Sequence, residues 1–230
     1  MFWWKKMITD KTITVLMCVH SRTDMNDNFL KDALLSVYNQ THKDYKVILL
    51  LDECWDKTKF IVENMISEYF SDHDFMLIEK DKKEGLAKAK NYALPFVDTE
   101  YVAFLDADDL YEPTKLEKQV KFLENNDVDF LATHSWNTRS TDRSIKCPSC
   151  FDENTYITHE EIKNVIHQEN VIAHGSLVVR TEAFKELGYY KHRLGIEDWD
   201  LWIRAIEGGY IFHQLPERLY VWCEGSSVAR

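Results

Sequence analysis

Tyr101-Val-Ala-Phe-Leu-Asp106-Ala-Asp108-Asp109 joins an apolar run to three carboxylates within four positions. A continuous apolar run of this kind is typical of a strand buried on both faces, as in the parallel sheets of α/β proteins. Ligands of open α/β sheets bind outside the carboxyl ends of the strands. An Asp-x-Asp pair at such an end can hold Mg²⁺ or Mn²⁺ through oxygen ligands, and the cation can in turn bind a diphosphate.

The same acidic cluster also has a purely structural interpretation. Carboxylates after a strand often lie in a solvated loop or cap a helix, and Pro113 is well placed to be the first residue of a following helix. The metal hypothesis therefore depends on what the rest of the chain offers.

Composition indicates a folded protein of 230 residues with a substantial core. Hydrophobic residues make up 45% of the chain, which argues against disorder. A formal net charge of −11 argues against a nucleic-acid partner, because phosphate backbones are bound mainly by clustered Lys and Arg. An anionic substrate would need help from a metal ion or from a few placed lysines.

The cysteines and the termini bear on the compartment. Five cysteines, an odd number, favour a reducing and hence cytoplasmic setting, and the close pair Cys147 and Cys150 lacks a second CxxC to complete a zinc site. No run approaches the ~18 apolar residues of a membrane span. The opening residues 1–7 lack the apolar core of a secretory signal, and we interpret them as an exposed tail that leaves peripheral membrane association open.

Hydrophobic periodicity predicts strands that alternate with helices. This order favours right-handed crossovers and a mainly parallel sheet. The polar stretch 135–154 has no period, and we expect a long irregular loop that serves as a lid or a binding segment. Strands are expected at 13–19, 47–51, 75–78, 101–105, 129–133 and 176–179, and helices at 29–38, 61–70, 86–94, 113–125, 181–187, after the capping box at 158–161 and from 197 to the glycines at 208–209.

Five short motifs occur in order along the chain, and together they resemble the family 2 inverting glycosyltransferases with the GT-A fold. Leu51 stands where that family has the first of two aspartates, and Lys90 where it has an arginine. The motifs are Ser36-Val-Tyr-Asn-Gln40-Thr41 after the first strand, Leu49-Leu-Leu51-Asp52, Gly85-Leu-Ala-Lys-Ala-Lys90-Asn91, Phe104-Leu-Asp106-Ala-Asp108-Asp109 and Glu197-Asp198.

The resemblance covers nearly the whole chain and implies a fold. We expect an α/β protein of GT-A type, with a Rossmann-like, mixed but mainly parallel sheet flanked by helices on both faces. Residues 1–134 would form the half that binds the nucleotide sugar. Residues 135–230 would form the half that binds the acceptor and carries the catalytic base.

The resemblance also assigns residues to the donor base. Asp52 would accept a hydrogen bond from the imide N–H of a pyrimidine, which a carboxylate can do and Leu51 cannot. Cys18 and His20 would border the same base. The alternative for Asp52 is an ordinary turn residue at the end of a strand.

A second group would bind the sugar diphosphate. Asp106 would lie on the ribose or metal side, and Asp108 would bind Mn²⁺ or Mg²⁺ bridging the two phosphates. Lys90 would face the diphosphate as a point charge. Lys88 is a weaker candidate, because residues two apart on a helix do not share a face and one of the two lysines is expected to be solvated.

The late acidic motif would supply the base. Asp198 would take the proton from an acceptor hydroxyl, and Glu197 and Trp199 would contact the acceptor. Negative residues are also favourable in the first turn of a helix, and we prefer that structural explanation for Asp200. Trp202 shares the apolar face of its helix and is expected in the core.

A third metal ligand is not evident. The family often has a C-terminal histidine that reaches the metal, whereas residues 221–230 contain none, and Glu224 is a possible substitute. His174 and His213 are further candidates, although lone histidines are more often structural.

The resemblance therefore implies an enzyme that transfers a sugar from a UDP- or dTDP-linked donor to a saccharide or glycan hydroxyl with inversion. A sugar-phosphate nucleotidyltransferase is a poor alternative, because residues 20–24 after the first strand contain no glycine to form its activating loop. The alternative from another class is a sugar-nucleotide binding module without catalysis, which the departures at Leu51, at Lys90 and at the C-terminus leave open.

Overall fold

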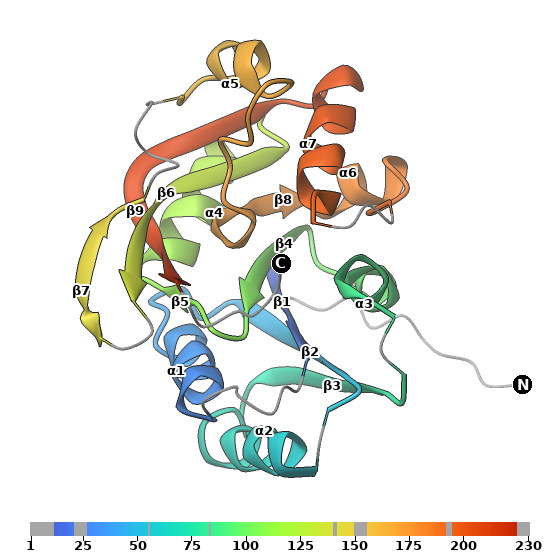
Figure 1. Cartoon of the computed structure of the whole chain (residues 1–230), viewed down its shortest axis with the longest axis vertical. Coiled ribbons are helices and arrows are strands. Elements are labelled where there is room, and N and C mark those ends of the chain that lie inside the picture. The colour runs from blue at the N-terminus through green and yellow to red at the C-terminus, as the bar shows by residue number, and fades with distance from the viewer. Residues whose placement is uncertain are drawn as a thin grey trace, which may run out of the picture.

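A computed structural model of the chain describes residues 12–20, 27–54, 56–82, 84–139, 142–149, 156–191 and 195–224. These residues form a nine-stranded sheet with helices on both faces (Figure 1). The strands are β1 (Ile13–Val19), β2 (Tyr45–Asp52), β3 (Asp74–Lys80), β4 (Tyr101–Asp106), β5 (Leu110–Tyr111), β6 (Phe130–Arg139), β7 (Asp142–Pro148), β8 (Val178–Arg180) and β9 (Phe212–Glu224). The helices are α1 (Asp27–Tyr38), α2 (Asp56–Tyr69), α3 (Leu86–Ala93), α4 (Lys115–Asn125), α5 (His159–Val165), α6 (Thr181–Glu186) and α7 (Glu197–Glu207), with 3₁₀ turns η1 (Leu94–Phe96) and η3 (His174–Ser176).

The sheet is mixed, and its longest ladders are parallel, as predicted. Its strand order is β3-β2-β1-β4-β8-β6-β9-β5, and β7 pairs with β6 outside this path. The first four strands are parallel, whereas β8 is antiparallel to both neighbours. Cys18 lies opposite both Leu50 and Asp106 in this register. The carboxyl ends of β1, β2 and β4 therefore meet at one edge of the sheet.

The two faces of the sheet are covered by separate hydrophobic cores. Alternate residues of β1 illustrate this, because Val15 and Met17 pack with α1, α2 and α4, while Leu16 packs with α3, α5, α6 and α7. Burial on both faces explains why β1, β2 and β4 are continuous apolar runs in the sequence. None of the described helices is long and apolar enough to cross a lipid bilayer.

The expectation of an irregular loop over 135–154 is wrong for most of that stretch. β6 continues to Arg139 and pairs with β7 in a hairpin. Polar side chains misled the prediction, because Ser135 and Thr138 are 1% and 3% exposed although they lie in a strand. Residues 140–141 and 150–155 lie outside the described residues, and so does Cys150.

The sequence pattern also missed β9, which forms a ten-residue parallel register with β6. The register slips between Thr133, His134 and Ser135, which pair with Leu215, Arg218 and Tyr220. Pro216 lies in the skipped segment, where it does not have to donate to the ladder. Because β6 runs through residue 134, the two proposed halves of the chain share one sheet.

Helix boundaries follow the expected signals with one exception. Thr158 and Glu161 form the predicted capping box of α5. The helix expected from Pro113 instead begins at Lys115, with Thr114 as its cap residue. The Pro113 carbonyl accepts a hydrogen bond from the backbone N–H of Thr41 at 2.9 Å, so this residue belongs to a turn before α4.

The segment after the acidic cluster is fastened to the end of α1 by Gln40, which is fully buried. Its Nε2 donates to the carbonyls of Ser36 and Glu112 at 3.0 and 2.8 Å, and its Oε1 accepts from the N–H of Leu116 at 3.0 Å. The Ser36 hydroxyl accepts from the N–H of Tyr111 at 3.1 Å. Ser36 and Gln40 therefore hold in place the backbone that follows Asp109 in the sequence.

Replacing Gln40 with leucine is expected to lower the free energy of unfolding by about 2 kcal/mol or more, because buried backbone groups of Glu112 and Leu116 would lose their partner. Urea unfolding measures this change. Gln168→Leu, at an exposed position after α5, is the matched control and should leave the midpoint unchanged. Equal midpoints for the two variants would contradict the proposed role.

Candidate active site

The three carboxylates after β4 have different environments. Asp106 and Asp108 are partly exposed, whereas Asp109 is 2% exposed. The Oδ1 of Asp109 accepts from the backbone N–H of Cys223 at 2.8 Å, and its Oδ2 accepts from the Tyr220 hydroxyl. Asp109 therefore fixes the acidic loop to β9 and is a structural residue.

Asp106 and Asp108 fit a hard divalent cation. Burial raises the pKa of Asp109 well above its usual value, and the charges of Asp108 and Asp106 raise it further, which shows how closely the acids gather. A divalent cation would offset this repulsion. No group of three or more His, Cys, Asp and Glu residues in the described ranges converges on a metal position. Mg²⁺ is commonly held by one or two carboxylates together with substrate phosphates, so two protein ligands suffice.

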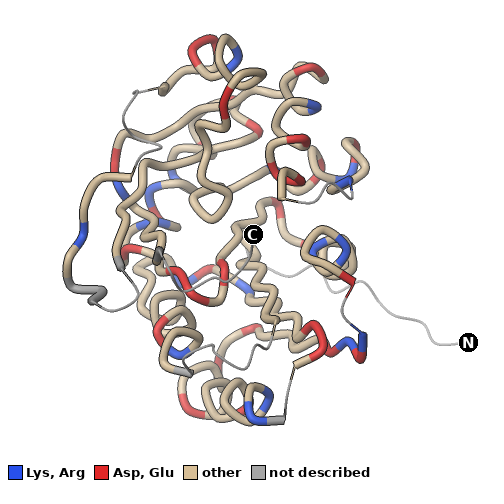
Figure 2. The backbone as a smooth tube through the Cα atoms, viewed as in Figure 1, with Lys and Arg blue, Asp and Glu red and all other residues tan. Residues whose placement is uncertain are grey.

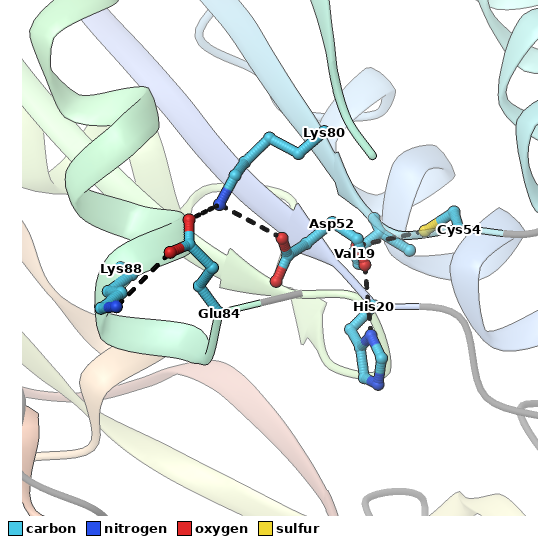
Figure 3. A network of polar contacts seen from close by, with 7 residues as sticks. All are labelled: Val19, His20, Asp52, Cys54, Lys80, Glu84 and Lys88. Atoms are coloured by element: carbon cyan, nitrogen blue, oxygen red, sulfur yellow. Dashed lines mark hydrogen bonds and ion pairs between the residues drawn. The ribbon is translucent and has the colours of Figure 1, made fainter. Parts of the chain in front are cut away.

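Asp52 ends β2, is 3% exposed, and lies at the centre of the network in Figure 3. Its Oδ1 is 3.5 Å from the Nζ of Lys80, and that Nζ is 3.3 Å from Oε2 of Glu84. His20 lies beside Asp52, with Nδ1 3.2 Å from the Asp52 carbonyl oxygen. Sequence reasoning missed Lys80. The signal that could have found it is the parallel pairing of β2 with β3, which sets Lys80 opposite Asp52.

The two lysines of α3 point in different directions, as their spacing predicted. Lys88 is 53% exposed, and its Nζ is 3.4 Å from Oε1 of Glu84 (Figure 3). Figure 2 shows that Lys and Arg alternate with Asp and Glu along the backbone between the end of β3 and α3. Lys90 is only 4% exposed and points inward. The structure therefore places Lys90, and not Lys88, toward the carboxyl ends of the strands.

Cys18 marks the middle of the site. Burial raises the pKa of its thiol to about 12, with Lys90 acting in the opposite direction and Asp106 and Asp52 adding to the rise. The side chain is thus an uncharged thiol between the end of β2 and the end of β4. It can line a base or ribose, but it is not a nucleophile at neutral pH.

Asp198 lies in the first turn of α7. Its Oδ1 accepts the backbone N–H of Trp199 at 2.7 Å. Burial raises the pKa of Asp198, while Lys90 and the Trp199 N–H act against this rise. A carboxyl with a raised pKa is better suited to take up a proton near neutral pH than an ordinary aspartate.

Tyr190, which is 3% exposed, lies within electrostatic reach of both acidic motifs. Burial raises the pKa of its hydroxyl, and the charges of Asp198, Asp106 and Glu197 raise it further. Asn91 holds the Tyr190 backbone, donating to its carbonyl at 2.7 Å and accepting from its N–H at 3.0 Å. Acidic residues from the middle and from the end of the chain thus both affect the pKa of the Tyr190 hydroxyl.

Three other side chains of α7 make contacts within the protein. The Trp199 indole N–H donates to the Ile166 carbonyl, and Trp202 is fully buried as predicted. The Oδ2 of Asp200 accepts from Arg204 Nε at 2.8 Å, which supports the structural explanation preferred for it.

The two histidine candidates do not join Asp106 and Asp108 in a metal site. The ring of His213 stacks on Phe122 with centroids 4.8 Å apart, and His213 pairs with Leu131 in the sheet interior. His174 lies near Lys90 and Tyr190 instead. The side chain of Glu224 lies outside the described part of the chain.

Comparisons with known proteins agree with this geometry. The family model described as glycosyl transferase family 2 matches residues 14–188. An uncharacterized glycosyltransferase of Methanocaldococcus jannaschii is 32% identical over 209 residues, covering 90% of this chain and 69% of the relative. The O-antigen biosynthesis glycosyltransferase WbnJ of Escherichia coli is 26% identical over 196 residues, covering 84% of this chain and 71% of the relative.

Solved structures establish the predicted GT-A fold. S. aureus TarS 1–349 in complex with UDP-GlcNAc superimposes with a TM-score of 0.74 at 18% identity, covering 95% of this chain and 61% of that chain. A mannosyltransferase from Pyrobaculum calidifontis, in complex with GDP-Man and Mn²⁺, has a TM-score of 0.69 at 20% identity, covering 93% and 58%. The chain therefore spans about three fifths of these solved chains.

Proposed function

Because this chain belongs to glycosyl transferase family 2, we propose that it transfers a sugar from a nucleoside diphosphate sugar to a saccharide hydroxyl, with inversion at the anomeric carbon. The observation that supports this proposal most is that Asp106 and Asp198, which are far apart in the sequence, both raise the pKa of the Tyr190 hydroxyl. A pair of acidic motifs on one site suits a reaction that needs both a leaving-group site and a base. A binding module needs no base.

Asp198 is the general base in this proposal. As the acceptor oxygen attacks the anomeric carbon, its proton passes to the Asp198 carboxylate, and the bond from that carbon to the diphosphate oxygen breaks with its electron pair on the diphosphate. The base and the leaving group lie on opposite faces of the sugar, so the configuration inverts. Glu197, in the same helical turn, would contact the acceptor or the donor sugar.

Asp106 and Asp108 would hold Mg²⁺ or Mn²⁺, which when bound offsets charge on the departing diphosphate. Lys90 adds a buried positive charge on the side of α3. These groups orient the donor so that the anomeric carbon faces Asp198. Orientation of this kind supplies much of the rate, because reactive groups held in place no longer lose translational freedom.

The base site favours a pyrimidine. The Asp52 carboxylate would accept the imide N–H of uracil or thymine, and Lys80, 3.5 Å from that carboxylate, is placed to donate to a ring carbonyl beside it. The structure of TarS contains UDP-GlcNAc and that of the mannosyltransferase GDP-Man with Mn²⁺. We propose a UDP- or dTDP-linked donor for this chain.

The acceptor is proposed to be a saccharide of a growing glycan. One relative, 30% identical over 105 residues, covering 46% of this chain and 40% of that protein, is named as a glucosyltransferase acting on an α-D-GlcNAc-diphosphoundecaprenol. Another is named for O-antigen biosynthesis. Residues 135–230, which carry Glu197 and Asp198, would form the half that receives the acceptor.

The proposal is tested with a panel of UDP-, dTDP-, GDP- and CDP-sugars, assayed for binding by calorimetry with and without Mn²⁺ and for transfer to simple glycosides. We expect pyrimidine diphosphates to bind more tightly with Mn²⁺ and at least one donor to be turned over to a product of inverted configuration. Equal binding with and without Mn²⁺ and no transfer from any donor would support a binding module instead.

Replacing Asp52 with asparagine is expected to weaken UDP binding about tenfold, which is the loss typical for a hydrogen bond to a charged group. The preference for UDP over CDP should narrow, because cytosine has no imide N–H and an amide can donate to its ring nitrogen. Glu79→Gln, at an exposed position near the end of β3, is the control and should bind UDP as the wild type does. An unchanged UDP affinity in Asp52→Asn would refute the base assignment.

A further inference from the structure

The charged end of Lys90 lies among neutral partners. Its Nζ is 3.2 and 3.4 Å from Nε2 and Nδ1 of His174 and 5.4 Å from the centroid of the Tyr190 ring. In the described ranges no carboxylate forms an ion pair with this ammonium. Asp198 and Cys18 feel its charge from a greater distance. A buried ammonium of this kind needs a group that fixes its position.

His174 is held firmly enough to be that group. Its ring stacks on Trp202 with centroids 6.0 Å apart and packs against Phe104 at 4.8 Å. The Tyr190 hydroxyl lies 2.8 Å from Nε2. Burial, and then the charge of Lys90, lower the pKa of His174 well below its ordinary value. A neutral imidazole keeps one lone pair in either tautomer, whereas a protonated one has none and would repel the ammonium.

We propose that His174 is a positioning residue, whose neutral imidazole, oriented by Tyr190, holds the Lys90 ammonium between Asp198 and the diphosphate site at the end of β4. This role rests on the proposed function, because it acts through the base and the donor. Sequence reasoning considered His174 only as a metal ligand and did not single out Tyr190.

The charges around Asp198 predict the direction in which its pKa should move if this role is correct. The groups that act on this region are Lys90 from α3, Cys18 from β1, Asp106 from β4, Glu197 from α7 and Tyr190 before α7. Of these, only Lys90 is positive. If Lys90 loses its position, the pKa of Asp198 rises, and the acidic limb of the pH profile of kcat/KM moves to higher pH.

The first test compares His174→Met, which removes the lone pairs, with His174→Gln, which keeps an acceptor. We expect His174→Met to move the acidic limb to higher pH and to weaken UDP binding in Mn²⁺ about tenfold, the cost typical for a hydrogen bond to a charged group. His174→Gln and Tyr190→Phe should show smaller changes in the same direction. Lys118→Met, at a position 40% exposed on α4, is the control. It should change neither the acidic limb nor the affinity for UDP. If His174 were only structural, replacing it would lower the stability of the protein without moving the acidic limb of the pH profile.

The second test needs no catalysis. Nuclear magnetic resonance of ¹⁵N-labelled histidine should show the His174 ring neutral through the physiological pH range, and Lys90→Met should raise its pKa. A His174 that titrates at about 6.5 in the wild type, as a free imidazole does, overturns the proposal. So does a His174→Met variant with wild-type UDP affinity. If the resonance and affinity changes occur as expected while no donor is turned over, the positioning role stands and the proposed function fails.

Discussion

Replacing Asp198 with asparagine is expected to lower kcat by about 10²- to 10⁴-fold while the donor still binds, because an amide cannot take the acceptor proton. The wild-type rate should fall as the pH drops through the pKa of Asp198, which burial has raised. The variant has no carboxyl to protonate and should lose that acidic limb. Steady-state kinetics between pH 5 and 9 measure both effects. An Asp198→Asn variant that transfers sugar at the wild-type rate would show that another residue is the base.

Melting temperatures distinguish this loss of activity from misfolding of the variant. Because the pKa of Asp198 is raised in the folded state, its contribution to stability is present below the unfolded pKa and is lost as the pH rises through the folded pKa. At neutral pH the carboxylate is therefore a net cost, and Asp198→Asn should melt at the same temperature as the wild type or higher. Asp200→Asn is the contrast, because it loses the 2.8 Å contact with Arg204 and should melt lower while it keeps kcat.

The part of the fold that could be predicted is the part in which both faces of a strand are covered. β1, β2 and β4 are mostly apolar at successive positions because helices pack on both sides, and in β4 the acidic residues begin where that burial ends. β6 and β9 could not be predicted in this way. Ser135 and Gln214 are polar but 1% and 2% exposed, so their strand character comes from neighbouring strands and not from their own chemistry.

In the active site too, the roles of some residues depend on partners that are distant in the sequence and cannot be predicted from their own chemistry. Asp108 and Asp109 are identical and adjacent in sequence, and only the fold distinguishes them, because the partners of Asp109 are 111 and 114 residues away. Tyr190 gave no sequence signal either. Its importance comes from Asn91 and His174, which lie 99 residues before it and 16 residues before it. Lys80 is the intermediate case, since a parallel register alone places it opposite Asp52.

Replacing Asp108 with asparagine is expected to lower kcat/KM by about a thousandfold, because a bound metal ion supplies several kcal/mol of stabilisation to charge that develops on the leaving group. The variant should bind UDP with the same affinity in the presence and absence of Mn²⁺. In the wild type, Mn²⁺ should strengthen UDP binding, since Asp106 and Asp108 would hold the ion and its charge would attract the phosphates. Calorimetric titration of UDP at several Mn²⁺ concentrations measures this difference directly.

Asp109→Asn is the matched control, because the two residues are neighbours with the same chemistry and different partners. Its amide would face the Tyr220 hydroxyl and the Cys223 N–H with one acceptor instead of two, at a cost to stability of about 1–3 kcal/mol. Its UDP affinity should still respond to Mn²⁺. If Asp109→Asn loses the Mn²⁺ response and Asp108→Asn keeps it, the metal lies on the buried side of the loop, and the donor must enter from the side of β9 instead of that of β1 and β2.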